Sequence, residues 1–117
     1  MASHFDLVTF DSPDPDEAAT FWAAALALVE TEREDGDRWI VLVDVMGVRR
    51  IGLQRGPVRP GTVHLDLSCG PEEFSDEVSR LLCLGAQLVS SARIEPYGSI
   101  ANLVDPDGNL FDLCAYR

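Results

Sequence analysis

The residues with the clearest capacity for chemistry are one histidine and two aspartates on predicted strands. His64 and Asp66 alternate with apolar residues, so both side chains lie on one face of an extended chain. Asp112 lies between apolar neighbours on the last predicted strand, after the turn sequence Asp105–Gly108. Imidazole and carboxylate groups can bind a divalent ion, hydrogen-bond a ligand, or pair as an acid/base couple. The alternative is a histidine satisfied by its neighbours and an aspartate that points to water.

The composition excludes several classes of partner. The chain has 117 residues, 46% hydrophobic and 25% charged, which is typical of one globular domain. Its 20 acidic and 9 basic residues give a net charge of -11, which disfavours nucleic acid and anionic membranes as partners. This charge would suit a cationic ligand, although an acidic surface also serves solubility alone.

The cysteines and the first residues indicate a compartment. Cys69, Cys83 and Cys114 are odd in number and have no Cys-x-x-Cys spacing, so we expect buried thiols rather than disulfides or a zinc knuckle. The chain opens without a basic and apolar leader sequence, and no apolar run is long enough to span a bilayer. We therefore expect a cytoplasmic protein.

The first half of the chain predicts a strand, a helix and three further strands. A strand over 5–10 is followed by a helix over 15–28, with Asp14 as N-cap and Pro15 at its first position. Strands are then expected within 30–37, over 38–44 and over 48–54. The helical stripe predicted to face the core consists of Ala18, Phe21, Trp22, Ala25 and Val29.

The second half repeats this order. A strand over 62–67 precedes a helix that opens at 69–73 and ends at Gly85, with Phe74, Val78, Leu81 and Leu82 as its stripe. Strands follow over 87–93 and 99–104, and then the closing hairpin. The sequence therefore predicts an α+β fold of two βαβββ modules, about 3–56 and 62–117, joined by a Pro/Gly linker at about 56–61. With a helix on the outside of each sheet, the uncovered faces of a curved mixed sheet would form a trough for a ligand.

The repeat assigns equivalent positions to the two modules. Leu7 and His64 correspond in the leading strands, and Gln54 and Asp112 correspond in the closing strands. Trp39, at the start of a central strand, is a candidate wall of the trough, where an aromatic ring can stack on a planar ligand. Its alternative role is packing within the sheet.

The double βαβββ layout, Phe21-Trp22, the strand Val63–Leu67 and the turn Asp105–Asp112 together resemble one superfamily. This is the glyoxalase/bleomycin-resistance/extradiol-dioxygenase superfamily, also called vicinal oxygen chelate, and the resemblance is to its small bacterial glyoxalase-like proteins. It covers nearly the whole chain.

In metal-dependent members, the first and last strands of each module supply four His, Glu or Gln ligands. Carried over by position, these fall on Leu7, Gln54, His64 and Asp112. Leu7 cannot bind a metal, so the resemblance implies an incomplete set of His64, Gln54 and Asp112, which would suit Fe²⁺, Mn²⁺ or Ni²⁺ with waters. We expect no cofactor other than such a divalent ion.

Three functions stay open at this point. The first is a bleomycin-resistance-like protein that binds a small molecule, cationic or aromatic, through Trp39, Gln54, His64, Asp66 and Asp112. The second is a metal-dependent lyase, isomerase or dioxygenase acting on vicinal oxygens, so whether the chain is an enzyme is undecided. The third is a structural domain whose trough is filled by its own side chains. The resemblance also implies a homodimer.

Overall fold

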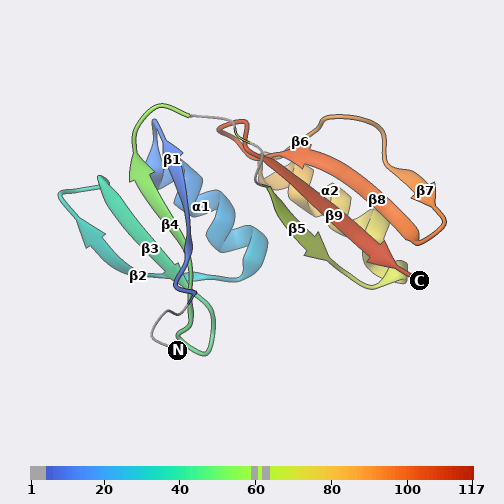
Figure 1. The fold of residues 1–117 in the computed structure, drawn as a ribbon, viewed down its shortest axis with the longest axis horizontal. Helices are drawn as coiled ribbons and strands as arrows, with labels where there is room; N and C mark the ends of the chain where they lie inside the picture. Colours follow the sequence, from blue (N-terminus) through green and yellow to red (C-terminus); the bar gives the residue numbers. More distant parts are fainter. Residues whose placement is uncertain (1–4, 59–60, 62–63) are drawn as a thin grey trace. The chain divides into compact units, whose positions relative to one another are not determined.

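The computed structural model describes residues 5–58, 61 and 64–117 (Figure 1). The chain divides into two compact units, Met1–Arg59 and Pro60–Arg117, so the boundary falls within the linker predicted at about 56–61. Part of that linker, 59–60, and the first two residues of the strand predicted over 62–67 lie outside the described residues. Each unit is described by itself.

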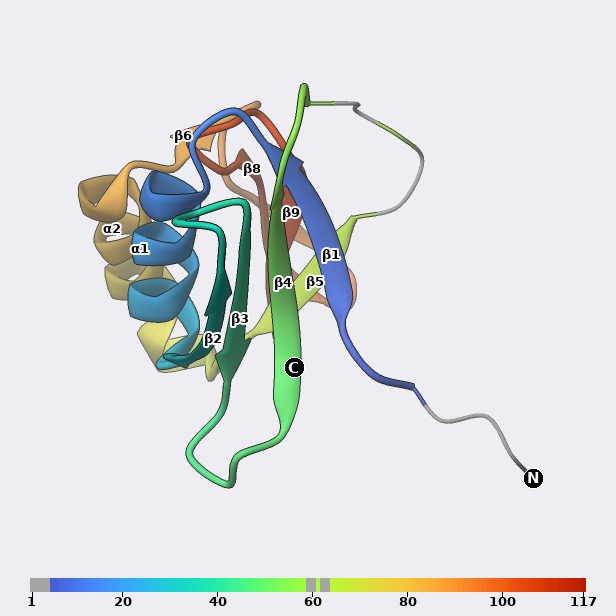
Figure 2. The ribbon, with the colours of Figure 1, turned by 90° about the vertical axis from the view of Figure 1, so that its left-hand side faces the viewer.

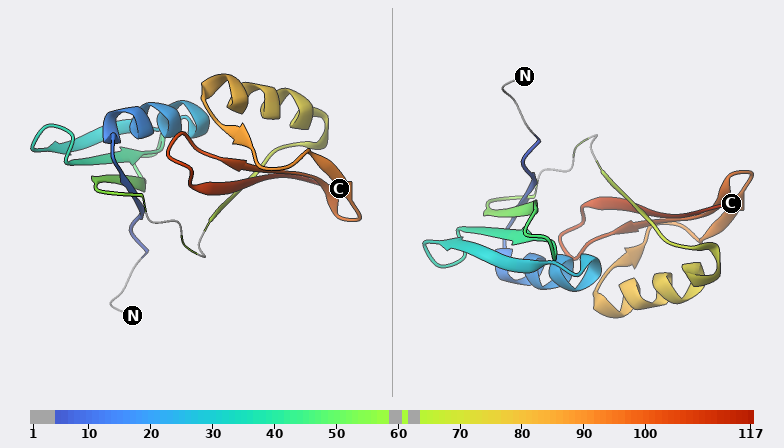
Figure 3. Two further views of the ribbon diagram at one scale, coloured as in Figure 1. Left: turned by 90° about the horizontal axis from the view of Figure 1, so that it is seen from above. Right: turned by 90° about the horizontal axis from the view of Figure 1, so that it is seen from below.

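The first unit is a mixed four-stranded sheet with one helix. β1 pairs with β4 in parallel, whereas β4 with β3 and β3 with β2 are antiparallel, which gives the order β1-β4-β3-β2. The helix α1 lies along one face of this sheet (Figure 3). In chain order the elements are β1 Val8–Ser12, α1 Pro15–Leu26, β2 Val29–Glu34, β3 Trp39–Val43 and β4 Arg49–Arg55.

The helix α1 begins and packs as the sequence predicts. The Asp14 side chain accepts a hydrogen bond of 3.2 Å from the backbone N–H of Glu17, which satisfies one free donor of the first turn. Trp22 is fully buried and stacks on Phe10, with ring centroids 5.5 Å apart. The inclusion of Val29 in the buried stripe was wrong, because α1 ends at Leu26 and Val29 opens the exposed strand β2.

The second unit repeats the topology with one difference. Its order β5-β9-β8-β6 matches that of the first unit, with β5 parallel to β9 and β8 antiparallel to β9 (Figure 2). β6 and β7 both pair with β8, so together they take the place of one strand. The elements are β5 Leu65–Ser68, a 3-10 turn η1 Pro71–Glu73, α2 Phe74–Leu84, β6 Gln87–Leu88, β7 Arg93–Glu95, β8 Gly98–Val104 and β9 Leu110–Tyr116. The α+β fold of two βαβββ modules is thereby confirmed.

The continuous strand predicted over 87–93 was wrong. Val89 still donates its N–H to the carbonyl of Asn102, at 2.9 Å, after which the chain bends away from β8 and returns only at Arg93. The bend contains Ser90, whose hydroxyl donates to Asn102 Oδ1 at 3.4 Å.

The core of the second unit lies between α2 and its sheet. Val78 and Leu81 are buried on α2, and Phe111 and Leu113 are buried on β9, which α2 contacts. Phe74 and Leu82, the other members of the predicted stripe, are less buried, and Leu82 is 38% exposed. Among the described residues, no helix has the length and apolar character needed to cross a membrane.

The turn of the closing hairpin is organised by one buried carboxylate. Asp105 is 3% exposed, and its Oδ1 accepts from the backbone N–H groups of Asp107 and Asn109, at 3.0 and 2.8 Å. Its Oδ2 accepts from the side-chain amide of Asn109 at 3.0 Å, and Gly108 takes the positive φ of 93° that the turn requires. This turn fixes how β8 and β9 face each other.

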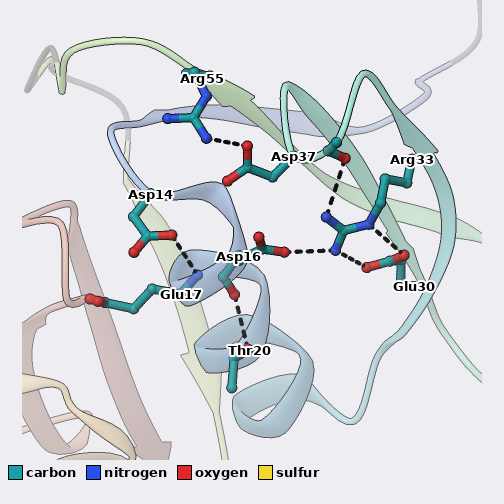
Figure 4. A network of polar contacts seen from close by, with 9 residues as sticks. Asp14, Asp16, Glu17, Thr20, Glu30, Arg33, Asp37 and Arg55 are labelled. Carbon is teal, nitrogen blue, oxygen red and sulfur yellow. Dashed lines mark hydrogen bonds and ion pairs between the residues drawn. The ribbon is translucent and has the colours of Figure 1, made fainter.

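Ion pairs link α1 to the strand that follows it (Figure 4). Arg33 on β2 binds both carboxylate oxygens of Glu30, at 3.1 and 2.7 Å, and Asp16 on α1 at 2.8 Å. Arg55 pairs with Asp37 in the same region. The hydrogen bonds from these arginines lower the pKa of Glu30 and of Asp37 below their usual values.

Acid should weaken the first unit through these pairs. Because the pKa of each carboxyl is lower in the folded chain than in the unfolded one, the pairs stabilise the fold above about pH 4.5, and this is lost as the pH falls further. Arg33→Gln should lower stability at pH 6 and flatten its decline in acid, as measured by urea unfolding across pH. Arg117→Gln, which removes the same charge, should leave the decline of the unfolding free energy in acid as steep as in the parent protein. An equally steep decline in the parent, Arg33→Gln and Arg117→Gln proteins would contradict the prediction.

Gly98 should tolerate no side chain. It opens β8 with φ +142°, and a Cβ there would overlap the carbonyl oxygen of Ala115 on the neighbouring strand. Gly98→Ala should therefore lower the free energy of unfolding by about 3 kcal/mol or more. Gly61→Ala is the matched control, since a Cβ there has no atom within 4 Å, and it should change stability little in the same urea titration.

Candidate functional site

Three strands of the second unit place polar residues in one row. The register pairs Asp66 on β5 with Asp112 on β9, and Asp112 with Asn102 on β8. Directly paired residues point to the same face of a sheet, so the three side chains are neighbours. Phe111 and Leu113 alternate with Asp112 and are buried, which places the row on the opposite face of the sheet.

His64 completes the group at the entrance to β5. Its Nε2 lies 3.2 Å from Asp66 Oδ1 and 3.3 Å from Asp112 Oδ2, so one ring nitrogen faces two carboxylates. The side chain of Asp112 is 21% exposed, against 43% for His64 and 64% for Asp66. One donor atom of each of the three residues lies within 4.8 Å of the others.

The second oxygen of Asp112 is bound from the other side. Asn102 Nδ2 donates to Asp112 Oδ1 at 2.6 Å. Asn102 Oδ1 in turn accepts from Arg93 Nη1 at 2.7 Å and from Ser90 Oγ at 3.4 Å. Arg93 also contacts Glu95 through Nε, at 2.9 Å. A continuous polar chain therefore runs from Arg93 through Asn102 and Asp112 to His64.

A hollow of about 250 Å³ opens beside this chain. His64, Asn102 and Asp112 supply its polar wall, and Val89 and Leu110 its apolar wall. Both apolar side chains are about half exposed, at 56% and 49%. The space suits a small molecule with a polar end near the carboxylates and an apolar end near Val89 and Leu110.

Two of the three distances within the donor set match those between ligands of a divalent ion. Two ligand atoms bound at about 2.1 Å lie about 3.0 Å apart at a right angle and about 3.4 Å apart at a tetrahedral angle. The distances of 3.2 and 3.3 Å from His64 Nε2 to the two carboxylates fall in this range. One nitrogen and two carboxylate oxygens are ligands for Mn²⁺, Fe²⁺ or Ni²⁺, with positions left for a ligand's oxygens. The same distances also permit a histidine paired with two carboxylates.

A thiol near the row is unsuited to metal binding. Cys69 follows β5, and burial raises the pKa of its thiol above the usual value. It is therefore protonated at neutral pH, whereas metals and electrophiles react with the thiolate.

The other predicted site residues belong to the first unit. Gln54 is exposed on β4, Trp39 is half-buried on β3 opposite it, and Leu7 precedes β1. The contribution of Gln54 to a set with His64 and Asp112 stays a prediction, as does the role of Trp39 as a wall of a trough.

The strand registers sharpen the comparison between the repeats. In the second unit, His64 is two residues before Asp66, the partner of Asp112. In the first, Gln54 is paired with Asp11, and the residue two before Asp11 is Thr9. When Gln54 is matched with Asp112, the counterpart of His64 is therefore Thr9. Leu7 is the counterpart of His64 only in the other alignment of the repeats. In that alignment Gly52, which pairs with Thr9, is matched with Asp112.

Trp39 packs across its own sheet. Its indole lies over Gly52, where a Cβ would come within 2.5 Å of the ring, and Thr9 Oγ1 is also adjacent. The glycine provides the space that the ring occupies. The packing role considered for Trp39 is therefore present in the fold.

Removing this ring should cost stability. Trp39→Ala uncovers Gly52 and leaves the sheet face unfilled, and the half-buried position should reduce the free energy of unfolding by about 2–3 kcal/mol. Trp39→Phe, which keeps an aromatic ring, should recover most of the loss in thermal unfolding. A Trp39→Ala variant as stable as the parent would show that the ring contributes nothing to packing.

Sequence reasoning missed Asn102 and Arg93. The signal for Asn102 was a single amide among apolar residues on the predicted strand 99–104, on the face shared with Ile100 and Val104. Arg93 was placed at the end of a continuous strand, whereas the bend after Val89 gives it a separate pairing with Ile100.

The comparisons with known proteins agree with this fold. Residues 7–114 match the sequence model of the glyoxalase-like domain. A glyoxalase/bleomycin resistance protein/dioxygenase family enzyme from Burkholderia phytofirmans PsJN is similar in structure, with TM-score 0.82 and 18% identity over 98% of this chain and 100% of that one. A glyoxalase-related enzyme from Fulvimarina pelagi has TM-score 0.76 and 19% identity over 97% and 88% of the two chains. No curated protein sequence matches the chain.

A third similar structure contains a metal. It is a mutant of the fosfomycin resistance protein FosX from Listeria monocytogenes, complexed with Mn(II) and 1S,2S-dihydroxypropylphosphonic acid. Its TM-score is 0.79, with 19% identity over 100% of this chain and 93% of that one. The family match covers most of the chain, which therefore belongs to the glyoxalase-like domain family.

Proposed function

We propose that this protein binds a small molecule through a divalent metal ion held in the second unit by His64, Asp66 and Asp112. The observation that carries the proposal is the position of His64 Nε2, at 3.2 and 3.3 Å from two carboxylate oxygens. A bound cation would relieve the repulsion between these two carboxylates. The ligand would supply oxygens to the ion and place its apolar part against Val89 and Leu110.

The side chains of the group would hold the ion and set its position. Asp112 and Asp66 would orient the ion, and His64 would bind it through Nε2. When bound, the ion supplies Lewis acidity toward ligand oxygens.

A second candidate function is metal-dependent catalysis on a small substrate with neighbouring oxygens. It is favoured by the structural similarity to FosX complexed with Mn(II) and a dihydroxypropylphosphonic acid. With only three donors in the second unit's group, we rank ligand binding first and catalysis second. For either function we keep the expectation of a cytoplasmic protein that forms a homodimer, and sedimentation of the purified protein would test the dimer.

Metal titration tests the proposal. Mn²⁺ added to metal-stripped protein should bind at one site per chain, and His64→Ala or Asp112→Asn should each weaken binding roughly tenfold or more, because each removes one ligand of a charged site. Calorimetry, with electron paramagnetic resonance of the free ion, measures both affinity and stoichiometry.

The control is Asp76→Asn, which removes one exposed carboxylate from α2 and should leave Mn²⁺ affinity unchanged. Acetohydroxamate, a small chelator with two neighbouring oxygens, should bind more tightly to the Mn²⁺-loaded protein than to the stripped one. Equal Mn²⁺ affinity in the parent, the His64→Ala and the Asp112→Asn proteins would refute the metal site.

A further inference from the structure

Asp112 is the least exposed of the three acidic and imidazole groups, and it is the one with a partner on each side. Its Oδ2 faces His64, and its Oδ1 receives the amide N–H of Asn102 at 2.6 Å. A carboxylate with one oxygen bound in this way cannot rotate freely, and only the other oxygen is directed to the site.

The amide of Asn102 has one orientation that its neighbours accept. Its Oδ1 receives the Arg93 guanidinium at 2.7 Å, while its Nδ2 donates to the carboxylate. If the amide were turned over, Nδ2 would face the donor Arg93, and Oδ1 would face the acceptor Asp112. Both contacts would be repulsive, so the charged groups on either side select the observed orientation.

The geometry points to Asn102 as a positioning residue, held by Arg93, that presents Asp112 to the site through a single oxygen. This inference rests on the proposed function for the use made of Asp112, although the positioning itself is a property of the chain. Neither Asn102 nor Arg93 would be a ligand of the ion in this arrangement. Both act through Asp112, and Arg93 acts through Asn102.

The polar chain from Arg93 to Asp112 begins at the residue where the polypeptide returns to β8, after the bend that separates β6 from β7. A straight strand would continue the ladder along β8, whereas here Arg93 pairs with Ile100 and extends its side chain toward Asn102. Glu95 binds the Nε of Arg93, which holds the guanidinium in place. The break in the strand therefore has a consequence for the site, since the returning segment supplies the group that orients Asn102.

A double-mutant cycle on Mn²⁺ affinity tests the order of action. Asn102→Leu, which has a similar shape and no polar group, should weaken Mn²⁺ binding roughly 10- to 100-fold. Arg93→Gln should weaken it less in the parent, and should have no further effect in the Asn102→Leu background, because its influence passes through the amide. Arg93→Lys, which keeps a cationic donor, should recover part of the loss.

The control is Arg80→Gln on α2, which removes another paired arginine of the same unit and should leave the Mn²⁺ affinity unchanged.

A measurement without metal separates this inference from the proposed function. In stripped protein, the side-chain amide protons of Asn102 should give a well-separated pair of NMR signals, which Asp112→Ala or Arg93→Gln should each bring closer together. If Mn²⁺ binds the parent but Asn102→Leu binds it equally well, the positioning inference fails and the proposed function stands. If Mn²⁺ does not bind the parent, the proposed function fails, and the Asn102 signals alone decide the inference. Signals that do not respond to either variant would overturn it.

Discussion

The candidate site depends on the parallel pairing of β5 with β9. That pairing aligns Asp66 with Asp112, and the antiparallel pairing of β9 with β8 extends the row to Asn102. A shift of one residue between two strands would turn a carboxylate toward the apolar face and bury it without a partner. The register is held at one end by the buried Asp105, which closes the turn between β8 and β9. It is also held by Phe111 and Leu113, which can fill the core on one side only.

The electrostatics of the row follow from this alignment. Bringing two carboxylates to neighbouring positions costs free energy unless positive charge or hydrogen-bond donors accompany them. In the second unit Asn102 on β8 donates to Asp112 from one flank, and the His64 ring lies 3.3 Å from the same carboxylate on the other. The arginine behind Asn102 extends this arrangement, because a guanidinium polarises the amide whose N–H meets the carboxylate. The net charge of -11 attracts cations to the protein and repels anions.

Local sequence patterns predicted the elements well, since capping residues, alternation and turn chemistry act over a few neighbours. The N-cap Asp14, the buried Trp22 and the turn at Gly108 are all consequences of short-range rules. The break between β6 and β7 was missed because the pairing with β8 shifts between Leu88–Leu103 and Arg93–Ile100, and the pattern along one strand does not show its register against another. The hydrogen bond from Asn102 to Asp112 could not be predicted locally either. Alternation shows which face of its own strand a residue lies on, but not which residue of the next strand pairs with it.

The two units show how one topology carries two kinds of surface. When Asp112 is matched with Gln54, the paired residues of the same row are Asp66 and Asn102 in the second unit, and Asp11 and Trp39 in the first. The third strand thus carries an amide in one unit and an indole in the other. The amide binds the neighbouring carboxylate, whereas the indole covers Gly52 on the adjacent strand and gives the first row an aromatic surface. The candidate site of the second unit therefore depends on which residue types stand at shared positions of the fold, since the two units have the same order of strands.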